Sequence, residues 1–324
     1  MTMKKFSALV GGLALGLAVS GPAVAQVEVD PNLPAYEKVS GISGSLNSVG
    51  SDTLNNLMTL WAEGFKKVYP NVNVQIEGKG SSTAPPALIE ATAQLGPMSR
   101  AMKSSEMDEF EKKFGYKATP LRTSLDSLAV FVNKDNPISG LSLDQVDAMF
   151  SKTLRCGAAD EVSVWGDLGL SGGWTTAPIS LYGRNSASGT YGFFKQQALC
   201  KGDYKDTVKE QPGSASVVQG VSEDKNAAGY SGIGYTTSGV RAVPLAENGS
   251  SYVEPNQKTV GSGQYPLSRF LYIYINKAPG QPVDPLVQEF AKYIFSKEGQ
   301  EVVAKDGYYP VSPQIATQER AKLN

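Results

Sequence analysis

The sequence predicts an α/β protein built of two lobes, and three observations support this. The chain has 324 residues, enough for one large or two ordinary domains. Residues 72–76 alternate as a strand and lead through a Gly-rich turn into a helix, the repeating unit of α/β folds. Two similar strands, residues 127–132 and 269–275, each end in Asn-Lys. We expect them to be neighbouring hinge strands that bracket an inserted second lobe; the periodicity is equally compatible with two core strands of one sheet.

The composition excludes several classes of protein. Apolar residues make up 41% and charged residues 19% of the chain, which excludes a disordered or fibrous protein. The chain has no histidine, which excludes a Ser-His-Asp triad, a His-ligated zinc site and an imidazole base. The formal net charge is -1 and no basic stripe occurs, so we expect no nucleic-acid partner.

Residues 1–25 have the pattern of a secretory signal peptide. Lys4 and Lys5 precede an uncharged run, residues 6–19, that is too short to span a bilayer stably. An Ala-Val-Ala site follows, so we expect cleavage before Gln26 and an exported mature protein. The alternative is an uncleaved anchor.

The first regular element of the mature chain is an amphipathic helix. Residues 26–46 contain two prolines and little periodicity, which predicts an irregular N-terminal arm. Residues 51–53 then open a helix that Pro70 ends. Its buried stripe is expected to comprise Leu54, Leu57, Met58, Trp61 and Phe65.

Further elements follow from the same patterns. Beyond the strand at 72–76, helices are expected at 87–93 and 105–114. In the second lobe we expect, in order, a helix at 143–150, a strand at 179–182, a helix from 188 towards 200 and a helix from 213 through 221. A helix at 284–295 follows the second hinge strand.

The only two cysteines, Cys156 and Cys200, are predicted to form one disulfide. An even count in an exported chain favours pairing in an oxidising compartment. The alternative is two buried free thiols. Their number and spacing exclude a CxxC redox pair and a Cys-ligated metal, and we expect no metal or cofactor.

Hydroxyl side chains recur at the starts of the predicted helices. They lie at 51–53, at 81–83, at 188–190 and, more weakly, at 214–216. Helix N-termini present unpaired N–H groups and a positive dipole end, to which hydroxyls add further donors. Each cluster alone is most simply an N-cap, but four together indicate an anion site formed by both lobes.

Arg184 precedes one of these clusters by four residues and follows a predicted strand. That position places a guanidinium at the carboxyl end of a strand, beside a helix N-terminus. Ligands bind there in α/β proteins, and the planar donors of arginine suit tetrahedral oxyanions. We therefore interpret Arg184 as a ligand rather than a surface arginine.

From about residue 47 to its end, the chain resembles the phosphate-specific periplasmic substrate-binding proteins of bacterial ABC uptake systems. The resemblance rests on the order and spacing of four motifs: GSDTL at 50–54, GSST at 80–83, Arg184 with SGT at 188–190, and GYSGIGY at 229–235. It implies a two-lobed class II periplasmic-binding fold with a central ligand cleft that closes like a hinge on one phosphate ion. Lobe 1 would comprise residues 47–132 and 268–324, and lobe 2 residues 133–267.

The resemblance also implies a set of ligands. Carried over by motif, these are the side chains of Thr53, Ser81, Arg184 and Ser188 and the amides of Leu54, Gly189 and Thr190. With Ser51 of the first cluster and two further positions discussed next, the candidate phosphate site comprises Ser51, Thr53, Leu54, Ser81, Ser99, Asp126, Arg184, Ser188, Gly189 and Thr190.

The sequence departs from the family pattern where a carboxylate is expected. Some members carry an aspartate that accepts the proton of hydrogen phosphate, at a position where this chain has Ser99. Others pair the cleft arginine with an aspartate two residues later, where this chain has Ser186. Asp126 and Asp52 are the nearest substitutes; each is equally well explained as a turn or cap residue.

The function implied is that of a receptor, not an enzyme. It would bind inorganic phosphate in the periplasm and deliver it to the membrane permease of an ABC transporter. A receptor for sulfate or molybdate would share the fold. A secreted serine hydrolase or phosphatase is the other alternative: residues 222–225 match S-x-x-K, but no K-T-G or G-x-S-x-G motif accompanies them.

Overall fold

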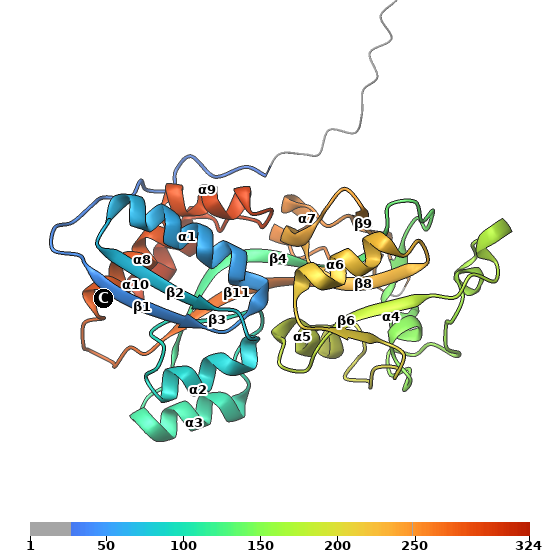
Figure 1. Cartoon of the computed structure of the whole chain (residues 1–324), viewed down its shortest axis with the longest axis horizontal. Coiled ribbons are helices and arrows are strands. Elements are labelled where there is room, and N and C mark those ends of the chain that lie inside the picture. Colours follow the sequence, from blue (N-terminus) through green and yellow to red (C-terminus); the bar gives the residue numbers. More distant parts are fainter. Residues whose placement is uncertain (1–26, 248) are drawn as a thin grey trace, which may run out of the picture.

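The computed structural model describes residues 27–247 and 249–324. The predicted signal peptide at 1–25 and its cleavage site lie outside the described residues. Two α/β lobes lie side by side and are joined by long strands that pass between them, as Figure 1 shows. None of the helices in the described part of the chain is long and apolar enough to cross a membrane.

One seven-stranded sheet connects the lobes. Its strands lie in the order β3 (Gly96–Met98), β11 (Ser268–Ile275), β4 (Thr119–Asn133), β8 (Ala227–Gly232), β6 (Ser180–Arg184) and β7 (Lys209–Gln211), and β9 (Val240–Ala242) also pairs with β4. The long strand β4 (Thr119–Asn133) is antiparallel to β11 (Ser268–Ile275) over residues 119–127. From Leu128 onward it pairs instead with β8 (Ala227–Gly232). The neighbour of β4 therefore changes from one lobe to the other at Leu128, and Figure 1 shows β4 running between the two bodies.

Lobe 1 is built on a small parallel pair, β1 (Gly44–Val49) and β2 (Val72–Glu77), and on the ends of β4 and β11. As predicted, the helix after residue 53 buries one face, which includes Trp61 and Phe65. Phe65 packs against Phe290, with ring centroids 5.2 Å apart. The remaining elements of this lobe are η1 (Asp52–Leu54), α1 (Asn55–Val68), η2 (Ser81–Thr83), α2 (Ala84–Ile89), β3 (Gly96–Met98), α3 (Ser104–Phe114), α8 (Pro285–Ile294), α9 (Lys297–Lys305) and α10 (Pro313–Ala321).

Lobe 2 surrounds a core of aromatic side chains. Phe194 stacks on Tyr230 with ring centroids 4.0 Å apart, and Phe150 meets both rings at an angle. The helices predicted at 143–150 and from 188 are present, the latter beginning at Gly189. The elements of this lobe besides β8 are β5 (Leu141–Ser142), α4 (Leu143–Phe150), η3 (Trp165–Leu168), η4 (Gly172–Trp174), β6 (Ser180–Arg184), α5 (Gly189–Gln197), β7 (Lys209–Gln211), α6 (Ser214–Glu223), η5 (Ile233–Tyr235), β9 (Val240–Ala242), β10 (Leu245–Ala246) and α7 (Gln257–Gly261).

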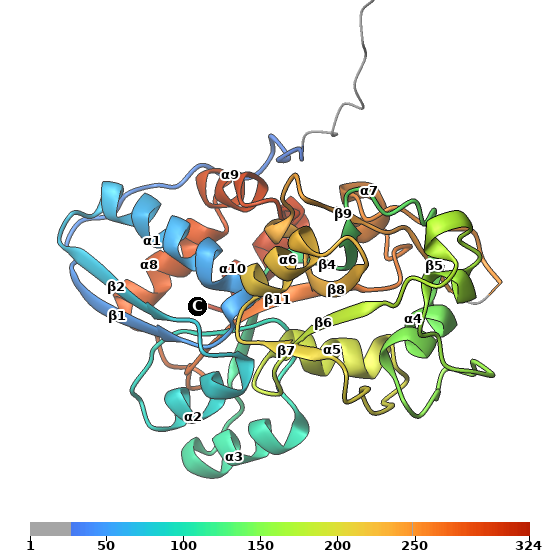
Figure 2. The same ribbon diagram turned by 45° about the vertical axis from the view of Figure 1, so that its right-hand side comes forward.

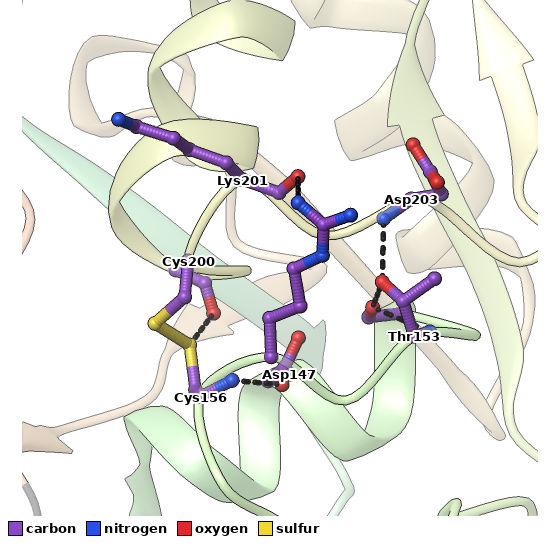
Figure 3. Close-up of a disulfide and its surroundings, with 9 residues drawn as sticks. Asp147, Thr153, Cys156, Cys200, Lys201 and Asp203 are labelled. Atoms are coloured by element: carbon purple, nitrogen blue, oxygen red, sulfur yellow. Dashed lines mark hydrogen bonds between the residues drawn. A yellow bond between two sulfur atoms is a disulfide. The ribbon is translucent and has the colours of Figure 1, made fainter.

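The predicted disulfide between Cys156 and Cys200 is confirmed. It joins the segment after α4 to the end of α5, within lobe 2 (Figure 3). The two Cα atoms are 5.3 Å apart, a normal distance for a disulfide. Asp147 of α4 also stabilises the backbone at Cys156, because its Oδ2 accepts a hydrogen bond of 2.8 Å from the amide of Cys156.

Candidate anion-binding site

Four buried hydroxyl groups meet where the lobes touch, and we call them the hydroxyl cluster: Thr53, Ser81, Ser99 and Thr190. Thr53 Oγ1 of lobe 1 lies 2.9 Å from Thr190 Oγ1 of lobe 2. Ser99 Oγ lies 3.4 Å from Thr190 Oγ1 and 3.3 Å from Ser81 Oγ. The first three come from η1, η2 and the end of β3, and Thr190 from the first turn of α5. Each of these hydroxyls is able to donate to and accept from a ligand.

Two glycines allow this close approach of the lobes. A Cβ on Gly189 would lie 2.3 Å from Ser81 Oγ and 2.7 Å from Ser99 Oγ, so no side chain fits there. Gly80 has a φ of 111° and faces Ala187, whose carbonyl oxygen would lie 2.6 Å from a Cβ. Next to it, the amide of Ser82 donates to that same carbonyl at 3.1 Å, which connects the lobes through their backbones.

Arg184, at the end of β6, is 1% exposed. Its Nη1 donates to Ser214 Oγ at 2.7 Å and its Nη2 to the carbonyl of Pro212 at 3.2 Å. Asp52 of lobe 1 approaches the same Nη2 at 3.2 Å. Arg184 Nε is buried and finds no acceptor among the described residues, so the side chain has a donor left for a ligand.

A second buried arginine, Arg269 at the start of β11, lies against the hydroxyl cluster. Its Nη2 donates to Thr190 Oγ1 at 3.0 Å, its Nη1 to the Ser99 carbonyl at 2.9 Å and its Nε to Asp126 Oδ2 at 2.8 Å. Its guanidinium also lies over the ring of Phe193, 5.3 Å from the centroid. Sequence reasoning missed Arg269. One signal was available in the sequence: Arg269 is the first residue of the apolar hinge strand 269–275, and Asp126 immediately precedes the hinge strand 127–132.

The two arginines make this region favourable for an anion. Burial lowers the pKa of Arg184, the positive charge of Arg269 acts in the same direction, and the Asp52 carboxylate opposes both. Arginine stays protonated in proteins, so the guanidinium of Arg184 keeps its charge. An anion placed between them would relieve their repulsion.

The other predicted residues lie around this centre in different roles. Ser188 is the N-cap of α5: its Oγ accepts from the amides of Thr190 at 3.1 Å and Tyr191 at 3.4 Å. Leu54 is buried at the end of η1, and Ser51 precedes η1 with its amide bonded to the Pro97 carbonyl at 2.8 Å.

Both candidate proton acceptors are already engaged by donors. In addition to Arg269, Asp126 accepts from the amide of Ile233 at 3.0 Å. Asp52 accepts from the amide of Ser214 at 2.8 Å and is paired with Arg184. Acceptance of the phosphate proton by Asp126 or Asp52 stays a prediction.

The residues of the hydrolase alternative do not form a catalytic group. The hydroxyl of Ser222 donates to the Gln219 carbonyl at 2.8 Å, which is a contact within α6. Lys225 lies over the ring of Trp174, 5.5 Å from its centroid. Among the described residues, no group of three or more His, Cys, Asp or Glu side chains is arranged to hold a metal ion.

Comparison with known proteins decides the family. Residues 35–298 match the PBP superfamily domain. The chain is 57% identical to the phosphate-binding protein PstS of Pseudomonas aeruginosa over 98% of this chain and 97% of that protein. The chain belongs to the PstS family of phosphate-binding proteins. Members of the PstS family are transport receptors, so the prediction that the chain is not an enzyme is confirmed.

Solved structures agree with the PstS assignment. A substrate-binding protein assigned to a phosphate ABC transporter of Clostridium perfringens, solved with bound phosphate, superposes with a TM-score of 0.70 at 25% identity, covering 83% of this chain and 100% of that one. A protein of Planctomyces limnophilus assigned as phosphate-binding gives a TM-score of 0.62 at 27% identity, over 87% and 98% of the two chains. The predicted two-lobed periplasmic-binding fold is thus confirmed.

Proposed function

We propose that this PstS protein binds inorganic phosphate between its lobes and delivers it to the membrane permease of an ABC transporter. The observation that carries the proposal is the buried hydroxyl cluster, flanked by Arg184 and Arg269 at the contact between the lobes. The relatives named above indicate which anion binds: their names specify phosphate, and one of the solved structures contains bound phosphate.

The site has enough donors to hold phosphate tightly. Charge-assisted hydrogen bonds contribute about 1.5–3 kcal/mol each, whereas micromolar binding needs only about 8 kcal/mol in total. Hydroxyl and amide dipoles with a buried arginine can reach this sum, so the chain's net charge of -1 does not oppose anion binding. The proposed ligand set remains Ser51, Thr53, Leu54, Ser81, Ser99, Asp126, Arg184, Ser188, Gly189 and Thr190.

Calorimetry on protein stripped of endogenous ligand tests the choice of anion. Phosphate, arsenate, sulfate and molybdate are titrated separately at the same pH and ionic strength. We expect tight binding of phosphate, comparable binding of arsenate because it has the same shape and protonation, and much weaker binding of the other two. Tight binding of sulfate or molybdate with weak binding of phosphate would replace this function with that of another oxyanion receptor.

Substitution of Arg184 tests the site itself. Arg184→Ala removes the buried guanidinium and should weaken phosphate binding by about 100-fold or more, while Arg184→Lys should recover only part because lysine lacks the planar donors. Arg155→Ala is the matched control, since Arg155 is an exposed arginine of the same lobe that donates to the Lys201 carbonyl. Unchanged affinity in Arg184→Ala, with the fold intact by circular dichroism, would place the site elsewhere.

We further propose that the protein is exported to the periplasm and cleaved before Gln26. Membership of a family of ABC transporter binding proteins and the N-terminal sequence pattern support this. The mass of the protein released from cells by osmotic shock would show it: the mature chain should begin at Gln26. A released chain that still contains Lys4 and Lys5 would contradict the cleavage.

A further inference from the structure

We propose that Asp52 is a positioning residue that acts across the cleft. It orients Arg184 from the opposite lobe and completes the N-terminus of α6, and in doing so it favours the closed arrangement of the lobes before an anion binds. This rests on the proposed function, because the closed arrangement matters only if the cleft holds a ligand.

Three donors of lobe 2 converge on this one residue of lobe 1. The amide of Ser214 donates to Asp52 Oδ2 at 2.8 Å, and Arg184 Nη2 lies 3.2 Å from the same oxygen. The hydroxyl of Tyr235 donates to the Asp52 carbonyl at 2.8 Å. Asp52 begins η1 at the head of α1, and Figure 2 shows this end of α1 and the start of α6 approaching one another. The contacts with Ser214 and Arg184 break when the lobes separate.

The start of α6 depends on this contact. The helix has ten residues, and its N-cap is Gly213, which has no side chain to accept from the first turn. An aspartate is among the best N-cap residues, and its negative charge suits the positive end of the helix dipole. Asp52 provides that carboxylate from the other lobe, so α6 is completed only in the closed protein.

The guanidinium of Arg184 also depends on Asp52 for its position and its counter-charge. Ser214 and Pro212 hold Arg184 from its own lobe, but both partners are neutral. Asp52 is the carboxylate that pairs with this arginine among the described residues. A buried charge without a partner is unfavourable, so opening the lobes costs free energy at Arg184 as well as at α6.

This role differs from acceptance of a ligand proton, and the difference is measurable. A residue that favours closure raises the affinity for every anion that binds in the closed cleft by the same factor. A residue that accepts the proton of hydrogen phosphate changes the ratio between phosphate and sulfate. Asp52 should therefore set the affinity and the dissociation rate and leave that ratio unchanged.

The test compares ligand-stripped wild type with Asp52→Ala by small-angle scattering and by stopped-flow phosphate dissociation. We expect a larger radius of gyration for the ligand-free variant, recovery of the wild-type value at saturating phosphate, and dissociation faster by about tenfold. The ratio of phosphate to sulfate affinity should stay within about threefold of wild type. Equal radii and equal dissociation rates would overturn the proposal, and so would a change of ratio without a change of radius.

Two further variants separate closure from simple helix stability. In Asp52→Ala/Gly213→Ser, a serine supplies the N-cap of α6 from its own lobe; a Cβ at Gly213 would meet Asp52 Oδ1 at 3.2 Å, an atom that the alanine removes. This variant should regain thermal stability and keep the fast dissociation. Recovery of slow dissociation would show that Asp52 acts only through α6 and would overturn the proposal.

Asp284→Ala is the matched control. Asp284 caps α8 within lobe 1, accepting from the amides of Leu286 and Val287, so its loss should lower stability and leave both the radius and the dissociation rate unchanged. Failure of wild type to bind phosphate would refute the proposed function instead. That result is distinct from a wild type that binds while Asp52→Ala behaves identically, which refutes only the present inference.

Discussion

The charges at the lobe contact form two arginine–aspartate pairs of different kinds. Arg184 and Asp52 come from opposite lobes, whereas Arg269 and Asp126 face one another across neighbouring strands. Asp126 is fully buried and Arg269 is 6% exposed. A pair of this kind adds little net stability, but removing one partner leaves an uncompensated buried charge. The second pair is therefore sensitive to single substitutions.

Arg269→Gln should destabilise the protein by about 3–5 kcal/mol, because the carboxylate of Asp126 is left without its counter-charge. The double variant Asp126→Asn/Arg269→Gln should recover a large part of that loss, since no charge then remains buried. Urea unfolding of the two single variants and the double variant measures the coupling. Losses that simply add would mean that the pair does not interact as the structure indicates.

Asp306, just after α9, gives the protein a pH dependence of the opposite sign to that of most carboxylates. Burial raises its pKa to about 6, although Asn56 donates a hydrogen bond to it. The pKa of an aspartate in an unfolded chain is about 4, so between these values the folded state holds a proton that the unfolded state has lost. The contribution of this group to stability therefore rises as the pH falls through 6.

Asp306→Asn should accordingly be more stable than wild type at pH 7.5, and about half of that difference should remain at pH 5, midway between the two pKa values. Asparagine carries no charge and keeps an oxygen that accepts from Asn56. Thermal unfolding of both proteins at the two pH values measures the difference. A constant difference at both values would show that the charge of Asp306 is not the cause.

At the scale of elements, the first turn of α5 determines how closely the lobes approach. Gly189→Ala should weaken phosphate binding by about tenfold or more, because the added methyl group would lie 2.3 Å from Ser81 Oγ and keep the lobes apart. Gly192→Ala, on the same helix, is the control: its nearest neighbour would be Arg100 Cδ at 3.6 Å, an ordinary contact. Alanine also favours a helix over glycine by about 1 kcal/mol, so the control should be slightly stabilised.

Phosphate titrations of both glycine variants test this reasoning. Equal affinities for the two variants would contradict the steric role of Gly189.

The elements that sequence periodicity predicted are those that bury a regular face. The amphipathic stripe of α1 and the apolar run of β11 were predicted within a few residues. The first eight residues of β4 were missed because Pro120, Arg122 and Asp126 interrupt the apolar alternation there. Strands of two or three residues, such as β3 and β7, are too short to show a period. They form because neighbouring strands provide hydrogen-bond partners, which is tertiary information.

In the candidate site, too, some residues could be predicted from local sequence patterns and others could not. Hydroxyls at helix starts are local signals, and all four clusters lie at the lobe contact in the structure. The role of Arg269 depends on the register that sets it opposite Asp126, 143 residues away in the chain. The contact of Asp52 with Ser214 depends on how the lobes meet. Neither relation is encoded by local spacing.

At the scale of the whole molecule, the two lobes have separate hydrophobic cores. Trp61 and Phe290 belong to one core, and Trp165 and Phe194 to the other. The cores approach one another at Leu125 and Ile233, which pack against both. The disulfide lies entirely in lobe 2, so its effect on stability should be confined largely to that lobe.

Cys156→Ala/Cys200→Ala should therefore destabilise lobe 2 by about 2–4 kcal/mol, mainly because the unfolded chain loses a cross-link between residues 44 apart. Hydrogen exchange on phosphate-free protein measures this: the slowest amides of β6 and β8 should lose protection, while those of β1 and β2 should not. An equal loss in both lobes would mean that they unfold as one unit.

The position of lobe 2 between β4 and β11 also determines the order in which a growing chain can fold. The core of lobe 2 comes almost entirely from residues 128–267, so it is complete before the C-terminal segment has been synthesised. Lobe 1 must wait for its central strand β11 and for Phe290. Until then the apolar face of α1, including Trp61, has no partner and is open to aggregation. A nascent chain of this protein thus needs protection at its N-terminal third while residues 128–267 are already folded.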